Sequence, residues 1–183
     1  MQDWQLINSF ADWFSALGTI GAVIVALYFA RQDKTIRLRV IAGHRIIFSP
    51  GIKGDPPQYL AIRITNVGHR DVQVTGIGWR IGMFRKIYAD QTIIPDGLSS
   101  TLPVRLRDGD EACYYIPLFS DIDWLREEFI QKMLQPNFKW RLRFTYVRIY
   151  TSVGRVFEEP LEQGLKRRIK DYVTQNPISE QIV

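Results

Sequence analysis

The sequence has few of the residues from which enzyme sites and disulfide frameworks are built. Its 183 residues include one cysteine and two histidines. One cysteine cannot form an intrachain disulfide, and neither His44 nor His69 lies in an HxH, HExxH or Cys/His pattern that would hold zinc. The chain also has no G-x-S-x-G elbow, P-loop or G-x-G-x-x-G fingerprint. We therefore expect no catalytic residues, no metal site and no cofactor, and we do not expect an enzyme.

Positive charge is missing from the first 30 residues, which contain no Lys or Arg and two acids, Asp3 and Asp12. The formal net charge of +5 therefore divides into −2 for this segment and +7 for the rest of the chain. Residues 13–30 form an uncharged run that would span roughly 27 Å as a helix. Because a bilayer core is about 30 Å thick, we expect a transmembrane helix within an N-terminal region of residues 1–34.

Three other interpretations of this run compete with a span. A helix lying on the membrane surface would need Lys or Arg along a polar face, and this run has none. A cleavable signal peptide would begin with basic residues, which are missing here. A buried helix of a soluble protein would fit the Ser, Thr and Gly residues that dilute the run. The flanking charges favour a single span, because Arg31, Lys34, Arg37 and Arg39 follow it. By the positive-inside rule they place the following domain in the cytoplasm and the N-terminus outside, with membrane lipid as a partner.

A stripe of polar and small residues follows one side of the expected helix at alternating spacings of three and four residues. Its members are Gln5, Asn8, Asp12, Ser15, Thr19, Ala22 and Ala26. Lipid does not stabilise polar groups, so the stripe should face protein or water. It predicts either a helix-packing face in a homo-oligomer or a pore lined by these side chains, with a ring of Asp12 carboxylates that prefers cations.

The remainder of the chain, residues 35–175, is expected to form a mainly β domain, an antiparallel sandwich-like or barrel-like sheet with two short helices. Turn signals separate the alternating segments. The expected strands are 35–48, 59–66, 72–81, 102–106, 112–116, 139–150 and 155–157. One helix should begin at Ser120 and end before Pro136, and another should cover Leu161 to Val173. Residues 176–183 have the composition of a flexible tail.

Basic residues alternate with apolar ones from Lys139 onward. As a strand, this segment would direct Lys139, Arg141 and Arg143 to one face, and the core would receive Trp140, Leu142 and Phe144. Further basic and aromatic candidates along the same hairpin are Arg148, Tyr150 and Arg155. Basic groups interleaved with aromatics suit a nucleotide or a short single-stranded nucleic acid. The basic face of the C-terminal helix, residues 166–170, could also serve such a ligand. The alternative is a solvated sheet face close to an anionic membrane leaflet.

Three segments carry a resemblance to known proteins: RQDKTIRLRV at 31–40, ITNVGHRDVQVTGIGW at 64–79 and YTSVGRVF at 150–157. With the preceding span, they resemble small bacterial single-pass proteins of the inner membrane that carry a cytosolic β-sandwich. Proteins of this build act as membrane effectors in antiphage systems, and the chain looks similar to the membrane channel effector of Hailong-type defence systems. The resemblance implies a channel controlled by an oligonucleotide that a partner nucleotidyltransferase makes.

Together these observations predict an oligomeric membrane effector whose N-terminal helices form an ion-conducting pore. A nucleotide or short single-stranded nucleic acid bound to the β-domain would gate it. The alternative is a membrane-tethered protein-interaction module that does not conduct.

Overall fold

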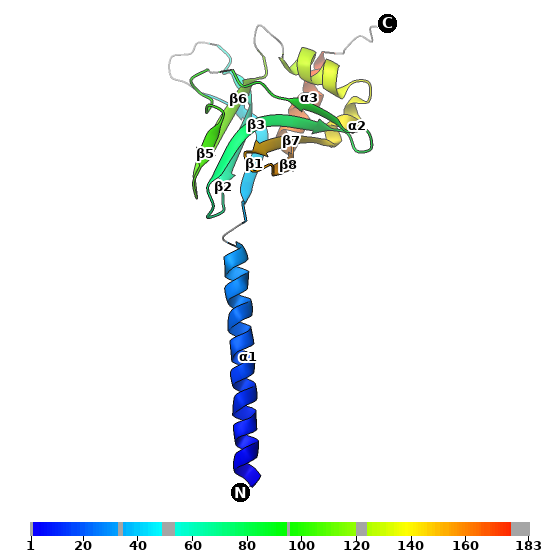
Figure 1. Ribbon diagram of the computed structural model, residues 1–183. Helices are drawn as coiled ribbons and strands as arrows, with labels where there is room; N and C mark the ends of the chain where they lie inside the picture. The colour runs from blue at the N-terminus through cyan, green and yellow to red at the C-terminus, as the bar shows by residue number, and fades with distance from the viewer. Residues whose placement is uncertain (1, 33–34, 49–53, 95, 120–123, 177–183) are drawn as a thin grey trace.

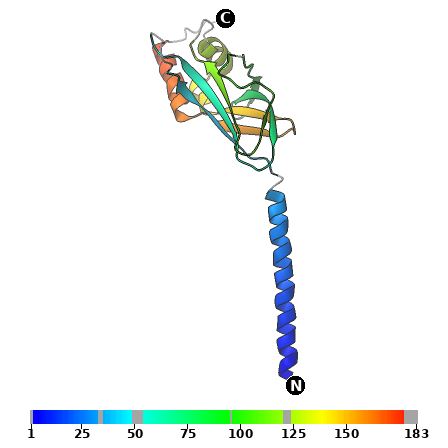
Figure 2. The same cartoon turned by 90° about the vertical axis from the view of Figure 1, so that its left-hand side faces the viewer.

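The computed structural model describes residues 2–32, 35–48, 54–94, 96–119 and 124–176, with the backbone alone for residues 2–12 and Gln32. Helix α1 (Gln2–Gln32) extends away from the rest of the molecule (Figures 1 and 2). Every side chain from Trp13 to Arg31 is exposed. This stretch is long and apolar enough to cross a membrane, judged by length and composition.

The rest of the chain is mainly β and forms two antiparallel sheets. The first sheet has the order β1-β2-β6, and the second has the order β4-β3-β7-β8, with β5 also paired to β3. The strands are β1 (Leu38–Ile46), β2 (Gln58–Asn66), β3 (Val72–Ile81), β4 (Ile87–Asp90), β5 (Val104–Leu106), β6 (Glu111–Pro117), β7 (Thr145–Thr151) and β8 (Val156–Pro160). The bounds of β3 are those predicted from the sequence. The short strand β4 was not predicted.

One hydrophobic core contains buried side chains from both sheets. The alternation predicted for the first strand segment is confirmed, because Ile36, Leu38 and Val40 are all buried. Trp79 on β3 is fully buried and packs edge-to-face on Phe129, with 5.3 Å between the ring centroids. This contact joins the second sheet to the helix that covers it.

Within the described residues, three helices accompany the sheets where the sequence predicted two. The π-helix η1 (Trp124–Leu134) ends with a bond from the amide of Gln135 to the carbonyl of Ile130. Leu125 and Phe129 on its apolar face are buried, as predicted. The predicted cap Ser120 lies outside the described residues. Helix α3 (Gln163–Gln175) confirms the predicted C-terminal helix.

The third helix, α2 (Phe138–Arg143), corrects the prediction of a strand over residues 139–150, since β7 begins only at Thr145. An alternation of six residues fits a short helix as well as a strand. The Arg141 guanidinium donates to the carbonyl of Met133, in the last turn of η1, and to the carbonyl of Gln135, directly after that helix. Carbonyl groups at the end of a helix have no hydrogen-bond partner within that helix. Their bonds to Arg141 therefore stabilise residues 138–143 as a helix.

Candidate functional site

The six basic and aromatic residues predicted to bind a ligand do not share one face. Lys139, Arg141 and Arg143 lie on helix α2, Arg148 and Tyr150 lie on strand β7, and Arg155 precedes strand β8. The prediction that the basic residues share one face of a strand is therefore wrong. The residues lie in three different places in the fold, and the contacts of the basic side chains differ from one place to the next.

Two of the predicted residues have structural partners. Arg141 binds the backbone carbonyls at the end of η1, as described above. The Nη1 group of Arg155 donates to the carbonyl of Ile36 at 3.1 Å. Its guanidinium also lies over the Phe157 ring, 4.9 Å from the centroid. Arg155 thus joins the β7–β8 turn to the chain segment that enters β1.

Arg148 and Tyr150 do lie together, on the outer face of the second sheet. Arg148 Nη1 donates to the Tyr150 hydroxyl at 3.3 Å. Glu158 lies between two arginines, with 2.6 Å to Arg80 Nε and 3.1 Å to Arg148 Nε. Only the first of these contacts has hydrogen-bond geometry, since Arg148 Nε is without a hydrogen-bond partner. The shared carboxylate offsets part of the positive charge that a phosphate would need.

A shallow groove of about 460 Å³ opens beside Tyr150, over the middle of β3. The Tyr150 ring covers the neighbouring glycine, because a Cβ added at Gly78 would lie 3.1 Å from Tyr150 Cε2. Burial raises the pKa of the Tyr150 phenol. Polar Asp90 and Gln91 and apolar Ile77 and Leu102 also line the groove, and none of its lining residues is cationic.

A different surface combines exposed aromatic rings with basic groups, and we call it the aromatic–basic patch: Phe84, Trp140, Arg143, Phe144, Lys166 and Lys170. The Phe84 and Trp140 rings are nearly parallel, with an interplanar angle of 15° and 6.3 Å between centroids. Trp140 also packs on Phe144 at 4.9 Å. Phe84 is 83% exposed and Trp140 is 43% exposed, so both rings are accessible.

The cations of the patch continue from these rings onto helix α3. The Arg143 guanidinium lies 5.8 Å from the Phe144 centroid, and the Lys166 amine donates to the Arg143 carbonyl at 3.4 Å. Burial lowers the pKa of Lys166, and the charges of Lys170 and Arg143 lower it further. The charges acting on this lysine are thus both positive, so an incoming anion would relieve their repulsion.

Sequence reasoning found part of this patch and missed the rest. Arg143 was predicted as a ligand residue, and Lys139, also predicted, lies on α2 outside the patch. Trp140 was placed in the core by the strand pattern and is exposed. Phe84 was missed. It lies in the β3–β4 turn after Gly82, which has a positive φ, and the sign of a ligand site in the sequence was an aromatic residue next to Arg85 and Lys86. Lys166 and Lys170 lie on the basic face of the C-terminal helix, which was also a candidate, but the sequence did not show that this face meets Trp140 and Phe84.

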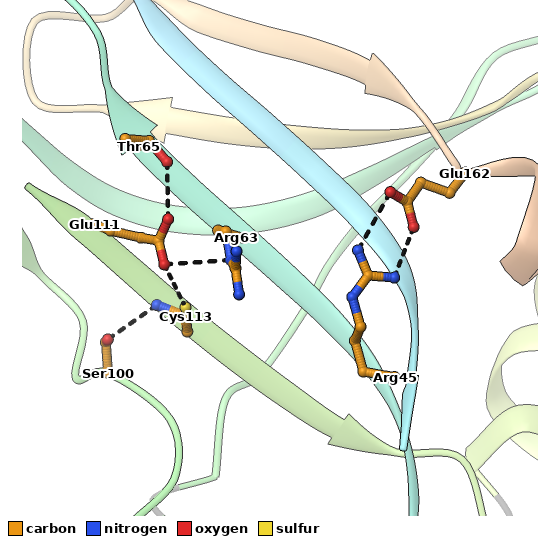
Figure 3. Close-up of polar contacts among 7 residues, drawn as sticks. All are labelled: Arg45, Arg63, Thr65, Ser100, Glu111, Cys113 and Glu162. Atoms are coloured by element: carbon orange, nitrogen blue, oxygen red, sulfur yellow. Dashed lines mark hydrogen bonds and ion pairs between the residues drawn. The ribbon is translucent and has the colours of Figure 1, made fainter. Parts of the chain in front are cut away.

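Ion pairs and hydrogen bonds between side chains lie over the outer face of the first sheet (Figure 3). Glu111 lies 3.2 Å from Arg63 and accepts hydrogen bonds from Thr65 Oγ1 at 3.1 Å and Cys113 Sγ at 3.4 Å. Burial raises the pKa of the Cys113 thiol, and the Glu111 carboxylate raises it further. A thiol held in its neutral form is a poor nucleophile. Among the described residues, no cluster of His, Cys, Asp or Glu could hold a metal ion.

The predicted stripe on α1 is described only in part. Ser15, Thr19, Ala22 and Ala26 are exposed on the helix, whereas the side chains of Asn8 and Asp12 lie outside the described residues. Thr19 Oγ1 donates to the Ser15 carbonyl at 2.9 Å, within the same helix. This bond satisfies the hydroxyl donor locally and leaves the oxygen lone pairs available.

Comparison with known proteins adds no family. No protein-family model matches the chain, and no curated protein is similar to it. One solved structure that matches is described as "X-ray structure of Northeast Structural Genomics Consortium target SoR45". Its identity to this chain is 13%, its TM-score is 0.29, and the match covers 73% of this chain and 91% of that one. A TM-score of this size supports no conclusion about fold or function.

Proposed function

We propose that the protein is a homo-oligomeric effector of the bacterial inner membrane whose α1 helices form a gated pore. The β-rich domain, in which we infer that the two sheets pack as a sandwich, would lie in the cytoplasm and bind the controlling ligand. The observation that carries the membrane assignment is the exposure of every side chain from Trp13 to Arg31 on a long apolar helix. Water does not stabilise so much exposed apolar surface, whereas lipid does.

The stripe on α1 supports self-association of these helices. Ser15, Thr19, Ala22 and Ala26 are small enough for close helix contact, and they face away from the bulky residues that suit lipid. If water fills the centre of the assembly, the lone pairs of Ser15 and Thr19 would line it. Asp12 would then form an acidic ring near the outer mouth.

A non-conducting, membrane-tethered interaction module is the second candidate, and the Thr19–Ser15 hydrogen bond favours it. Because the Thr19 hydroxyl already donates within its own helix, Thr19 can pack in a dry helix interface without leaving its donor unsatisfied. In that case the assembly would hold the β-domains together and conduct nothing.

We infer that the controlling ligand binds the aromatic–basic patch and is a nucleotide or a short single-stranded nucleic acid. Accessible rings at Phe84 and Trp140 can stack on bases, and Arg143, Lys166 and Lys170 can contact phosphates. The resemblance stated above supports an oligonucleotide made by a partner nucleotidyltransferase, in antiphage defence. To gate the pore, such a ligand must bind the open and closed assemblies with different affinity.

Ion flux from liposomes that contain the purified full-length chain tests the pore. Thr19→Phe should abolish flux, because it adds bulk to the stripe. The matched control Ile20→Phe adds bulk about 100° further around the helix, off the stripe, and should conduct like the wild type. Asp12→Ala should reduce the preference for cations. If Thr19→Phe and Ile20→Phe conduct equally, the stripe does not line a pore and the tethered module is the better description.

Fluorescence anisotropy with a labelled oligothymidine of about eight nucleotides tests the ligand site. Loss of one stacking ring in Trp140→Ala should weaken binding by about 5- to 150-fold, from about 1–3 kcal/mol per stacked base. Three patch cations should give a slope of about −2 for log affinity against log salt, and Lys166→Gln should reduce that slope by about 0.7. Lys132→Gln, on η1, is the control. Equal losses for Lys132→Gln and Lys166→Gln would rule out the patch as the site.

A further inference from the structure

The chain leaves helix α1 and enters strand β1 through a short, tethered segment. Thr35 Oγ1 donates to the carbonyl of Arg31 in the last turn of α1 at 3.0 Å. From Gln32 to Leu38 the chain advances six residues, a reach of at most about 20 Å. Whatever packs around residues 35–37 therefore lies close to the end of α1 (Figure 1).

Two turns of the domain are fixed around this segment. In the first turn, residues 66–71, the amide of Val67 donates to the Arg37 carbonyl at 3.0 Å. Gly68 lies against the same backbone, since a Cβ there would be 3.1 Å from the Arg37 nitrogen. In the second turn, residues 107–110, Gly109 donates to the Asn66 carbonyl at 2.9 Å. We call the surface formed by residues 35–39 and these two turns the linker end of the domain.

The linker end exposes an apolar residue among basic ones. Val67 is 51% exposed, and the side chains of Arg37, Arg39 and Arg107 are exposed as well. In the described part of the chain, no ion pair or hydrogen bond engages the guanidinium of any of these three arginines.

The acids of the same surface are already partnered. Asp71 pairs with Arg105 at 2.9 Å, and Asp108 lies 2.8 Å from His69 Nδ1. Asp110 Oδ2 accepts from the Arg107 amide at 2.9 Å. Basic groups nevertheless outnumber acids at this end. With Arg105 counted beside its partner Asp71, five arginines (37, 39, 70, 105 and 107) stand against three aspartates (71, 108 and 110), a formal excess of +2 (5 − 3).

We propose that the linker end is a docking surface for anionic lipid headgroups, which holds the domain upright on the leaflet that α1 leaves. Arg37, Arg39 and Arg107 would contact lipid phosphates, and Val67 would enter the boundary between headgroups and acyl chains. This inference rests on the proposed function in one respect, because α1 must span the membrane.

Docking would also determine where the ligand site points. Strand β3 starts directly after the first linker-end turn and ends at Ile81, just before Gly82 and the patch residue Phe84. Ten residues of strand extend about 30 Å. A domain docked at its linker end thus holds the aromatic–basic patch away from the bilayer and accessible from solution.

The test uses the full-length chain with Cys113→Ser, a bimane label at Val67→Cys, and a matched label at Gln175→Cys on α3. The chain is placed in vesicles of phosphatidylcholine and phosphatidylglycerol that contain a headgroup nitroxide quencher. We expect the Val67 label to be quenched and the Gln175 label to remain bright. Arg37→Gln and Arg107→Gln should each lower the docked-to-undocked ratio about fivefold, from about 1 kcal/mol per basic residue near an anionic leaflet.

Alkaline extraction of the same vesicles separates failure of the docking from failure of the anchor. A chain that resists extraction but shows equal quenching at the two labels overturns the docking and leaves the anchor intact. The docking is also overturned if the Val67 label is quenched as strongly in vesicles of pure phosphatidylcholine as in vesicles that contain phosphatidylglycerol. The arginines would then not recognise anionic headgroups. A chain that alkali releases overturns both the span and the docking.

Discussion

The carboxylate of Glu162 reaches across strand β1 and pairs with Arg45 at 2.8 Å, directly over Gly43 (Figure 3). A Cβ added at Gly43 would lie 1.8 Å from Glu162 Oε2 and 2.6 Å from Arg45 Nη1. The absence of a side chain at residue 43 is thus what allows this ion pair to form. The pair joins β1 to the segment between β8 and α3, beside the backbone bond from the Glu162 amide to the Ala42 carbonyl.

Gly43→Ala should therefore displace the ion pair and change the free energy of unfolding by only a few tenths of a kcal/mol. Both obstructing groups are the ends of flexible side chains, and alanine is favoured over glycine in a strand. The diagnostic measurement is a double-mutant cycle. Glu162→Gln should cost about 0.2–1 kcal/mol in the wild type, as exposed pairs do, and almost nothing in Gly43→Ala.

The matched control for this cycle is Gly164→Ala. A Cβ at Gly164 meets no atom within 4 Å, and alanine in a helix is more stable than glycine by up to about 1 kcal/mol. The cost of Glu162→Gln should be the same in Gly164→Ala as in the wild type. If the cost also stays unchanged in Gly43→Ala, the ion pair accommodates the methyl group and the proposed displacement is wrong.

Phe129 joins helix η1 to the second sheet and should be among the most costly residues to truncate. It is fully buried and packs on Trp79 at 5.3 Å and on Trp124 at 5.1 Å. Phe129→Ala should reduce the free energy of unfolding by about 3–5 kcal/mol, and Phe129→Leu should cost less because it leaves a smaller cavity. Urea unfolding followed by tryptophan fluorescence measures both.

The exposed neighbour Gln131 provides the control for this prediction. Gln131→Ala should stay within about 0.5 kcal/mol of the wild type, since surface substitutions usually do. A loss for Phe129→Ala as small as that for Gln131→Ala would mean that η1 contributes little to the stability of the sheet.

The parts of the fold that could be predicted from the sequence are those in which neighbouring residues along the chain determine the secondary structure. Strand β3 was predicted with its observed bounds, Val72–Ile81, since its alternation is long and turn residues flank it. Strand β4, Ile87–Asp90, was missed because it is short and mostly exposed, with no alternation of buried and exposed residues. Helix α2 was mistaken for a strand because its six residues fit both periods and long-range bonds decided between them.

The candidate ligand site was harder to predict for a related reason. The patch brings together Phe84, Trp140 and Lys166, which come from a turn and two helices. No local pattern states that these segments meet. The sequence did identify Lys139 and Arg143 as ligand candidates, because basic and aromatic residues alternate there, but the wrong secondary structure placed Trp140 in the core.

His44 should make the stability of the domain fall as the pH falls below about 6.5, the ordinary pKa of a histidine. Burial lowers its pKa below the ordinary value of 6.5, and the charges of Arg168 and Arg45 lower it further, against a raising hydrogen bond with Gln58. The unfolded chain therefore binds the proton more readily than the folded one. Stability from this group is complete above pH 6.5 and is lost as the pH falls through the lowered pKa.

Thermal unfolding of the full-length chain in detergent at a series of pH values measures this effect. His44→Gln should remove the part of the slope that His44 causes, while His69→Gln, which alters the exposed pair with Asp108, should retain it. An unchanged slope in His44→Gln would contradict the assignment.

Cys113 should react slowly with alkylating reagents, and Glu111 should control the rate. The pKa of the thiol is raised by burial and by the neighbouring Glu111 carboxylate, whereas Arg63 lowers it. Glu111→Gln removes the negative charge and leaves Arg63 beside the sulfur, so the pKa should fall and iodoacetamide should react faster near pH 8. Arg63→Gln should have the opposite effect, because only the thiolate attacks the reagent.

Thr65→Val separates charge from packing at this site. It removes the 3.1 Å hydrogen bond to Glu111 Oε2 without changing any charge, so the apparent pKa from the pH dependence of alkylation should move much less than in Glu111→Gln. Mass spectrometry can follow the modification, because Cys113 is the single cysteine of the chain. If all three variants accelerate the reaction equally, exposure of the sulfur and not the charge of Glu111 limits its reactivity.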